Sequence, residues 1–301
     1  MKDMSLPPSA KGTVAFGEYK TWYRVTGDLG SGVPPVVVVH GGPGSTHDYL
    51  LPLARLAEDG RPVVHYDQIG NGGSTHLPGR GPDFWTVDLF LAELDNLLRS
   101  LDIADGYVLY GQSWGGLLAA KHAAARPRGL RGLVVADSPV SYPLWLEEMA
   151  VLRSQLPPGV NETLLRHEAA GTTSSEEYYE AMTPFYEKHV CRLKPWPREY
   201  QASFYEVYND PTVYYTMNGP SEFHVTGTLR DWGVEDCLPD IAVPTLVLSG
   251  RHDEATPKTV RPYQELIPDA RWVIFEDSSH LPHLEEPESF HQVLTEYLKD
   301  L

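Results

Sequence analysis

The sequence predicts an α/β fold: a mostly parallel eight-stranded sheet flanked by helices, with one helical insertion. Apolar strand segments alternate with helical patterns near both ends of the chain, which is typical of a parallel sheet wrapped by helices. The segment PPVVVV at 34–39 has no polar alternation, as expected for a strand that is covered on both faces. Between residues 139 and 230 this alternation stops. These three observations set the fold class.

The predicted strands begin with a hairpin over residues 13–27, where apolar and polar residues alternate. Single strands are expected at 34–39, 61–67, 106–110, 131–137, 244–250 and 270–276. Helical patterns follow most of these strands and are expected at 87–101, 115–127, 257–267 and 288–298. The two halves together supply the eight strands of one sheet.

The middle segment, residues 139–230, holds nine of the 17 tyrosines and has helical patterns broken by prolines. We interpret it as a helical cap inserted into a core made of residues 1–138 and 231–301. An independent second domain is less favoured, because the sheet needs strands from both sides of the insertion.

Composition restricts the partners. Against 24 basic side chains there are 41 acidic ones, and the formal charge of −17 would repel nucleic acid and anionic membrane surfaces. No signal-peptide pattern and no run of 18 apolar residues occurs, so a cytoplasmic location is expected. The only cysteines, Cys191 and Cys237, have no metal-binding spacing and are expected to be free thiols. The sequence does not indicate an oligomeric state.

A serine between glycines joins a predicted strand to a predicted helix. Gly111, Ser113 and Gly115 match the G-x-S-x-G pattern, in which the serine lies on a strained strand-to-helix turn. Glycines are needed there because a β-carbon would clash with the neighbouring backbone. The hydroxyl of Ser113 is therefore the candidate nucleophile.

A serine hydroxyl needs a base to take its proton and an acid to orient that base. In this arrangement the acid and then the histidine follow the serine in the chain, each after a strand. Asp253 is the first carboxylate after the strand at 244–250, and His280 follows the strand at 270–276. His283 is expected to be a packing or surface histidine, and His252 is expected to be solvated or structural.

A glycine-rich loop, HGGPG at 40–44, follows the buried strand at 34–39. A tetrahedral intermediate needs two backbone N–H donors, one after the nucleophile and one from such a loop. We assign these donors to Trp114 and Gly42, and expect His40 to brace the loop. This chemistry requires no metal or cofactor, and the His280–His283 spacing makes a poor metal site because no third ligand is in view.

Several motifs together resemble those of the prolyl aminopeptidase (proline iminopeptidase) family of α/β-hydrolases. They span nearly the whole chain: HGGPG (40–44), DQIGNGGS (67–74), GQSWGG (111–116), SGRHDEATP (249–257) and SSHLPHLEEP (278–287). The resemblance implies an α/β-hydrolase fold with a helical lid, and removal of the N-terminal residue from small peptides and amides. The family's triad maps onto Ser113, Asp253 and His280, as assigned above from position.

The segment TMNGPSEFHVTGTLRDW (216–232) is similar to one in the tricorn-interacting aminopeptidases of this family. The likeness implies that Glu222, together with Glu254 after the catalytic aspartate, binds the free α-amino group of the substrate. Paired carboxylates suit an ammonium group in a partly desolvated pocket.

The predicted function is a serine aminopeptidase that releases a small apolar residue, proline or alanine, from a peptide or aminoacyl amide. One alternative is an amide hydrolase of natural-product biosynthesis that removes a terminal aminoacyl group from a large apolar amine. A second is an esterase or lactonase without amine recognition, and a third is a non-catalytic binding protein. An epoxide hydrolase or dehalogenase is disfavoured, since those enzymes use an aspartate where Ser113 stands.

Overall fold

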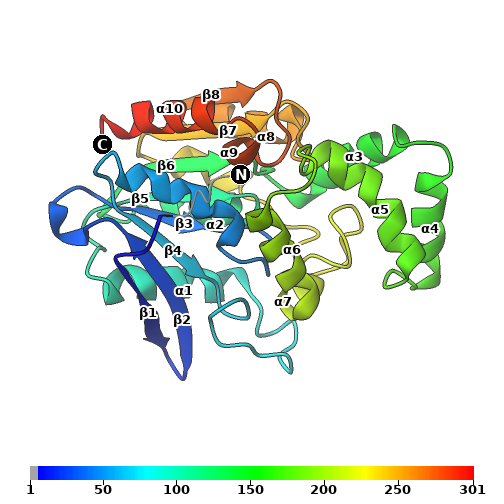
Figure 1. The fold of residues 1–301 in the computed structure, drawn as a ribbon, viewed down its shortest axis with the longest axis horizontal. Coiled ribbons are helices and arrows are strands. Elements are labelled where there is room, and N and C mark those ends of the chain that lie inside the picture. The colour runs from blue at the N-terminus through cyan, green and yellow to red at the C-terminus, as the bar shows by residue number, and fades with distance from the viewer. Residues whose placement is uncertain (1–5) are drawn as a thin grey trace.

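The computed structural model describes residues 6–301, and within that range it contains one eight-stranded sheet in the order β1-β2-β4-β3-β5-β6-β7-β8 (Figure 1). The pairs β1–β2 and β2–β4 are antiparallel and all other pairs are parallel. The strands are β1 (Ala10–Phe16), β2 (Tyr19–Thr26), β3 (Val36–Val39), β4 (Val63–Asp67), β5 (Tyr107–Gln112), β6 (Leu130–Ala136), β7 (Thr245–Gly250) and β8 (Ala270–Phe275). The predicted fold class is confirmed.

Helices cover both faces of the sheet. Helix α2 (Trp114–Ala124) packs on β5 and β6 and contacts α1 (Val87–Ser100), while α8 (Pro257–Leu266) packs on β7 and β8. The 3-10 helix η2 (Asp48–Ala57) packs on β4 and contacts α9 (Pro282–Glu285) and α10 (Pro287–Leu298). The strands between these layers are apolar because water reaches neither face; β3, β4 and β5 are buried along their whole length.

Helix α1 shows how the local sequence sets an element. The hydroxyl of Thr86 accepts a hydrogen bond from the Leu89 amide at 3.2 Å and so caps the helix. Phe90, Leu94 and Leu97 recur at spacings of three and four, and all are buried. The apolar stripe therefore faces the sheet layer while the other side of the helix faces solvent.

The turn after β5 is strained in the way the motif predicts. Ser113 has φ 57° and ψ −125°, a conformation that non-glycine residues rarely adopt. A β-carbon on Gly111 would overlap the carbonyl oxygen of Gly115, and one on Gly115 would overlap the carbonyl oxygen of Val39. Strand β5 and helix α2 can meet at this angle only because both positions are glycine.

Five α-helices lie between β6 and β7; in Figure 1, α3, α4 and α5 form the right-hand end of the molecule, and α6 and α7 lie nearer its centre. They are α3 (Tyr142–Ser154), α4 (Val160–Ala170), α5 (Glu176–His189), α6 (Arg198–Asn209) and α7 (Thr212–Met217). Helix α6 packs on η2, where the Ser203 hydroxyl lies 2.9 Å from that of Thr46 and accepts from the Tyr49 amide at 3.1 Å. The division into a core and a cap at 139–230 stays a prediction.

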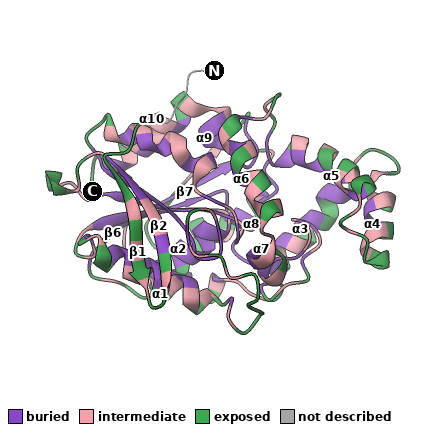
Figure 2. Ribbon diagram, turned by 60° about the horizontal axis from the view of Figure 1, so that its bottom comes forward, coloured by how far each residue is buried: buried purple, intermediate pink, exposed green. Residues whose placement is uncertain are grey.

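Buried side chains form one apolar cluster that runs from the sheet into these helices. Figure 2 marks buried residues along the strands and on parts of these helices. Leu164 of α4 and Tyr178 and Phe185 of α5 are fully buried members of the same cluster as the sheet valines. The helices of this segment are therefore packed as part of one hydrophobic core.

The predicted elements agree with the structure to within about three residues at each end. Four short helices outside the insertion were missed: η1 (Leu29–Ser31), η2, η3 (Glu235–Asp240) and α9. Pro52 lies inside η2, and a proline removes a backbone donor, so that stretch resembles a loop in sequence. The two cysteines are free, as predicted. No helix among residues 6–301 is long and apolar enough to cross a membrane.

Replacing Gly115 with alanine is expected to lower the free energy of unfolding by about 1–3 kcal/mol, because the new β-carbon overlaps the fixed Val39 carbonyl. Thermal or denaturant unfolding measures the loss. The control is Gly79→Ala, since nothing lies within 4 Å of a β-carbon there. Equal stability of the two variants would contradict the close approach of β3 and α2.

Candidate active site

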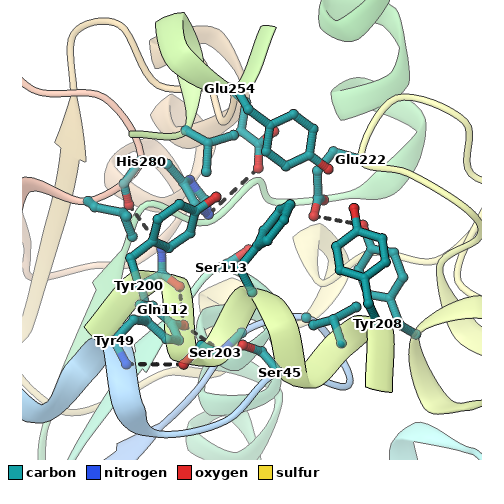
Figure 3. A pocket seen from close by; sticks show the side chains of 18 of the residues that line it. Ser45, Tyr49, Gln112, Ser113, Tyr200, Ser203, Tyr208, Glu222, Glu254 and His280 are labelled. Carbon is teal, nitrogen blue, oxygen red and sulfur yellow. Dashed lines mark hydrogen bonds and ion pairs between the residues drawn. The ribbon is translucent and has the colours of Figure 1, made fainter. Parts of the chain in front are cut away.

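A cavity of about 90 Å³ lies between the loops at the carboxyl ends of the strands and the helices α5 to α7. Five of the predicted site residues line it: Gly42, Ser113, Glu222, Glu254 and His280. Figure 3 shows Ser113 at the centre of the view, with the side chains of His280, Glu254 and Glu222 arranged around it. The structure thus brings together residues that are up to 238 positions apart (280 − 42) in the sequence.

A smaller cavity of about 10 Å³ adjoins the first and shares Gly42, Ser113, Glu254 and His280 with it. Its other walls are mainly apolar: Trp114, Leu117, Pro139, Tyr142, Trp145 and Ala255. Ser113 therefore faces two compartments, one larger and rich in tyrosine, the other barely large enough for a water molecule.

His280 and Asp253 form a buried pair. Nδ1 of His280 lies 2.7 Å from Oδ1 of Asp253, which also accepts from the Ala255 amide at 2.8 Å. Burial disfavours the charged imidazole, but the carboxylate of Asp253 outweighs it, so the pKa of His280 is raised above its ordinary value. Because Nδ1 donates to the carboxylate, Nε2 is the ring nitrogen left to face the cavity.

Two side chains that the sequence analysis did not single out hold this pair against the nucleophile loop. The side-chain nitrogen Nε2 of Gln112 donates to the His280 carbonyl at 3.1 Å, and the side-chain oxygen Oε1 of Gln112 accepts from the Tyr49 hydroxyl at 2.5 Å. Tyr49 in turn accepts from the Gly41 amide at 2.8 Å. Gln112 directly precedes Ser113, so its place in the motif was the available signal.

The predicted oxyanion donors flank Ser113. A β-carbon built on Gly41 would lie 3.0 Å from the Ser113 β-carbon, so the glycine loop runs directly past the nucleophile. Within residues 6–301, neither the Gly42 nor the Trp114 amide donates a hydrogen bond to another protein group. Both amides are thus available to a ligand oxygen.

His40 braces this loop from behind. Burial lowers its pKa to about 4, so the ring is neutral, and Nδ1 donates to the Gly41 carbonyl at 2.9 Å. Its Nε2 accepts from the Gln68 amide at 3.0 Å. The Gln68 side chain donates to the His40 carbonyl at 2.8 Å and accepts from the Trp114 indole at 2.9 Å. Gln68 therefore connects the glycine loop at 40–44 to Trp114, the two segments that are predicted to supply the oxyanion donors. No local sequence pattern predicted this contact.

Glu254 is buried and Glu222 is half-buried, and both line the cavity. Glu222 accepts from the Tyr214 hydroxyl at 2.7 Å, and Oε1 of Glu254 lies 3.7 Å from Nε2 of His280. Burial raises the pKa of Glu222, and burial together with the charges of Glu222 and Asp253 raises that of Glu254 well above its usual range. When two carboxyl groups line one cavity, the negative charge of one disfavours ionisation of the other.

The surroundings of the two glutamates add aromatic rings but no cation. No lysine or arginine of the described chain, residues 6–301, lines the cavity. Much of its wall is made of tyrosines: Tyr49, Tyr186, Tyr200, Tyr208, Tyr214 and Tyr215. Burial raises the pKa of Tyr186, Tyr200 and Tyr214 well above their ordinary value, so these phenols stay neutral. A small organic cation would find carboxylates and ring faces here, both of which favour it.

A buried ion pair holds the segment that carries Glu222. Arg153 of α3 lies 3.2 Å from Glu168 of α4 and stacks 4.8 Å above the ring of Phe223. Tyr178 of α5 contacts Glu168 at 3.2 Å and the Ser221 hydroxyl at 2.9 Å. Both neighbours of Glu222 are thus fixed by side chains from three helices.

The remaining histidines have structural partners. Nε2 of His283 lies 2.9 Å from the Tyr49 carbonyl, and burial lowers the pKa of His283 to about 4. The His252 carbonyl accepts from Nδ1 of His189 at the end of α5, and the His189 carbonyl accepts from the Glu254 amide at 3.1 Å. In the described part of the chain, no group of three or more His, Cys, Asp or Glu side chains could hold a metal ion.

Comparisons with known proteins place the site in context. The family model for the alpha/beta hydrolase fold matches residues 34–287. The proline iminopeptidase of Saccharolobus solfataricus is 38% identical over 93% of this chain and 88% of its own length.

Two solved structures resemble the whole chain. The crystal structure of VinJ shares 69% identity over 98% of this chain and 100% of that one, with a TM-score of 0.97. That of proline iminopeptidase from Mycobacterium smegmatis shares 47% identity over 97% and 98%, with a TM-score of 0.89.

Replacing Asp253 with asparagine is expected to lower the pKa of His280. The carboxylate that raises this pKa would be lost while burial, which lowers it, remains. Titration of the ring protons by NMR checks the shift, with Asp269→Asn on the exposed surface as control. An unchanged pKa would show that the two side chains are not coupled in solution.

Proposed function

Because the chain belongs to the proline iminopeptidase family of α/β-hydrolases, we propose that it is a serine aminopeptidase acting through an acyl-enzyme. It releases a small apolar N-terminal residue, proline or alanine, from a small peptide or aminoacyl amide. The observation that carries this proposal is the pair of glutamates, Glu222 and Glu254, beside Ser113 and His280 in a cavity that no lysine or arginine of residues 6–301 lines. Such a wall favours a substrate that brings its own positive charge.

Binding begins with the free α-amino group. We assign the ammonium to Glu222 and Glu254, where its positive charge favours the ionised form of carboxyl groups whose pKa is otherwise raised. Because Glu254 lies 3.7 Å from His280, an amine held there brings the adjacent carbonyl carbon to the nucleophile. By binding the α-amino group of the substrate, the two glutamates position the first amide bond of the substrate at Ser113.

In the proposed acylation step, Ser113, His280 and Asp253 act together as a catalytic triad. Nε2 of His280 takes the proton of the Ser113 hydroxyl as the oxygen attacks the carbonyl carbon. Asp253 holds the Nδ1 proton at 2.7 Å and stabilises the imidazolium. The negative oxygen of the intermediate receives hydrogen bonds from the Gly42 and Trp114 amides. His280 then protonates the leaving amine.

Deacylation repeats these steps with water. His280 takes a proton from the water, which attacks the acyl carbon, and returns it to Ser113 as the amino acid leaves. No metal or cofactor enters this sequence of steps. The fixed dipole of α2, whose first residue is Trp114, favours the developing negative charge in both stages.

The small second cavity supports a small acyl residue. It adjoins Ser113 and is walled by Trp114, Tyr142 and Trp145, which leave a volume of about 10 Å³. A compact proline or alanine side chain requires less displacement of these rings than a long one. The α-amino group then lies in the larger, tyrosine-lined cavity, because Glu222 lines that cavity and not the smaller one.

The other functions considered from sequence are less well supported. An esterase or lactonase has no use for two glutamates beside the nucleophile, and a non-catalytic binding protein has no need of a paired His280 and Asp253. Removal of an aminoacyl group from a large natural-product amine would use the same chemistry, and the comparisons do not favour it over peptides. A cytoplasmic location belongs to the same proposal.

Turnover of matched substrates tests the function. The enzyme is expected to cleave alanyl and prolyl coumarin amides and to cleave their N-acetyl counterparts at least about 100-fold more slowly, since acetylation removes the charge. Ser113→Ala is expected to abolish turnover of every substrate. Equal rates on free and acetylated amides would refute amine recognition but leave a serine hydrolase.

Glu222 gives a second prediction, which includes a pH dependence. Glu222→Gln should lower kcat/KM for free amines by about 10- to 100-fold, with Glu180→Gln, an exposed glutamate on α5, as the control. In the wild type, KM for a free amine should fall as pH rises through the raised pKa of the glutamate pair, because only the ionised pair binds ammonium. It should rise again above about pH 8, where the substrate amine loses its proton. A pH-independent KM below that point would contradict this assignment.

A further inference from the structure

A carboxyl group that the mechanism above does not use lies directly behind the catalytic acid. Asp137 follows β6, is fully buried, and has φ 49°, in the left-handed region. Its neighbour Ser138 donates to the Ser113 carbonyl at 2.8 Å. The turn after β6 therefore contacts the proposed nucleophile, Ser113, through Ser138, and Asp137 is the other residue of this turn.

The hydrogen-bond partners of Asp137 and Asp253 leave one oxygen on each side chain. Oδ1 of Asp137 accepts from the Gly250 amide at 3.1 Å, and Oδ1 of Asp253 accepts from His280 and Ala255. Both Oδ2 atoms are buried, and among residues 6–301 neither has a donor. Gly250 links the two residues, since its amide donates to Oδ1 of Asp137 and its carbonyl accepts from the Asp253 amide at 3.5 Å, and the charge of Asp253 acts on the pKa of Asp137.

Ionisation of both carboxyl groups is disfavoured in this arrangement. Each buried oxygen needs a donor, and one proton held between them satisfies both oxygens at once. Among residues 6–301, the charged groups that most affect the pKa of Asp137 are Asp253 and Glu285, both acidic, and the phenols Tyr49 and Tyr110 also lie near it. Burial and the charge of Asp253 raise the pKa of Asp137 well above its usual range.

We propose that Asp137 is a positioning residue for the triad: its carboxylic acid donates a hydrogen bond to Oδ2 of Asp253 and so fixes the carboxylate that orients His280. The proton belongs to Asp137 because Asp253 already accepts from His280 and from the Ala255 amide, whereas Asp137 accepts only from Gly250. This inference rests on the proposed function only in taking Asp253 as the catalytic acid.

Two substitutions separate the donor from the shape of the turn. Asp137→Asn keeps a donor for Asp253 and an acceptor for the Gly250 amide, and asparagine tolerates a positive φ. Asp137→Gly removes the donor without adding backbone strain. The control is Asp102→Gly, at an exposed turn with φ 56°, which reports what the same change does to stability far from the site.

Two readouts are measured: kcat at saturating free-amine substrate, and the NMR resonance of the His280 Nδ1 proton in the resting enzyme. For Asp137→Asn we expect kcat within about threefold of wild type and a retained downfield resonance. For Asp137→Gly we expect kcat to fall on the order of tenfold or more, KM to change little, and the resonance to move upfield or broaden, because Asp253 loses a donor. Asp102→Gly should alter neither readout.

Wild-type kcat and an unchanged resonance in Asp137→Gly would overturn the proposal, as would an equal loss in Asp137→Asn. If Asp137→Gly does not fold, the infrared difference spectrum between wild type and Asp137→Asn carries the test: the band of a protonated carboxyl is expected in the difference, and its absence there refutes the proposal. If the aminopeptidase function itself is wrong, activity survives in Ser113→Ala. The NMR resonance of His280 in the resting enzyme does not depend on that outcome and still tests the role of Asp137.

Discussion

The site depends on one electrostatic constraint: buried acidic groups surround a single imidazole. Asp253 lies against one ring nitrogen of His280 and Glu254 lies 3.7 Å from the other, while Glu222 is close enough to raise the pKa of the ring. Asp137 adds a further carboxyl behind Asp253. Such a cluster is stable only if protons, hydrogen-bond donors or a bound cation offset the charge. In the proposed function, the ammonium of the substrate is that cation.

The fold meets this constraint by dividing the acids between elements that are fixed to each other. Glu254 follows β7, whereas Glu222 lies in the segment after α7 and is held by Tyr214 and by the contacts of Arg153 with Phe223. Hydrogen bonds between His189 and the loop 252–254 join the two sides. Loss of any of these contacts would alter the spacing of the two glutamates, and with it the amine recognition that we propose for them.

Much of this could be predicted from the sequence because it depends on local patterns. Uninterrupted apolar runs marked the buried strands, and the glycines around Ser113 marked the turn, since only glycine fits both close approaches. The contacts that complete the site could not be predicted in this way. Gln68, Tyr214 and Arg153 act on residues brought near them only by folding. Asp137 did stand at the end of a strand, but nothing local distinguishes a carboxyl that shares a proton from a turn residue.

Measurements of substrate binding without turnover test the proposed recognition of the free amine most directly. The affinity of Ser113→Ala for prolyl and alanyl amides, measured by calorimetry in buffers of different ionisation enthalpy, reports both the preference for a free amine and the protons exchanged. The account predicts that the free amines bind at least about 100-fold more tightly than their N-acetyl counterparts and that binding near neutral pH releases protons from the glutamate pair. Equal affinities with no proton release would contradict it.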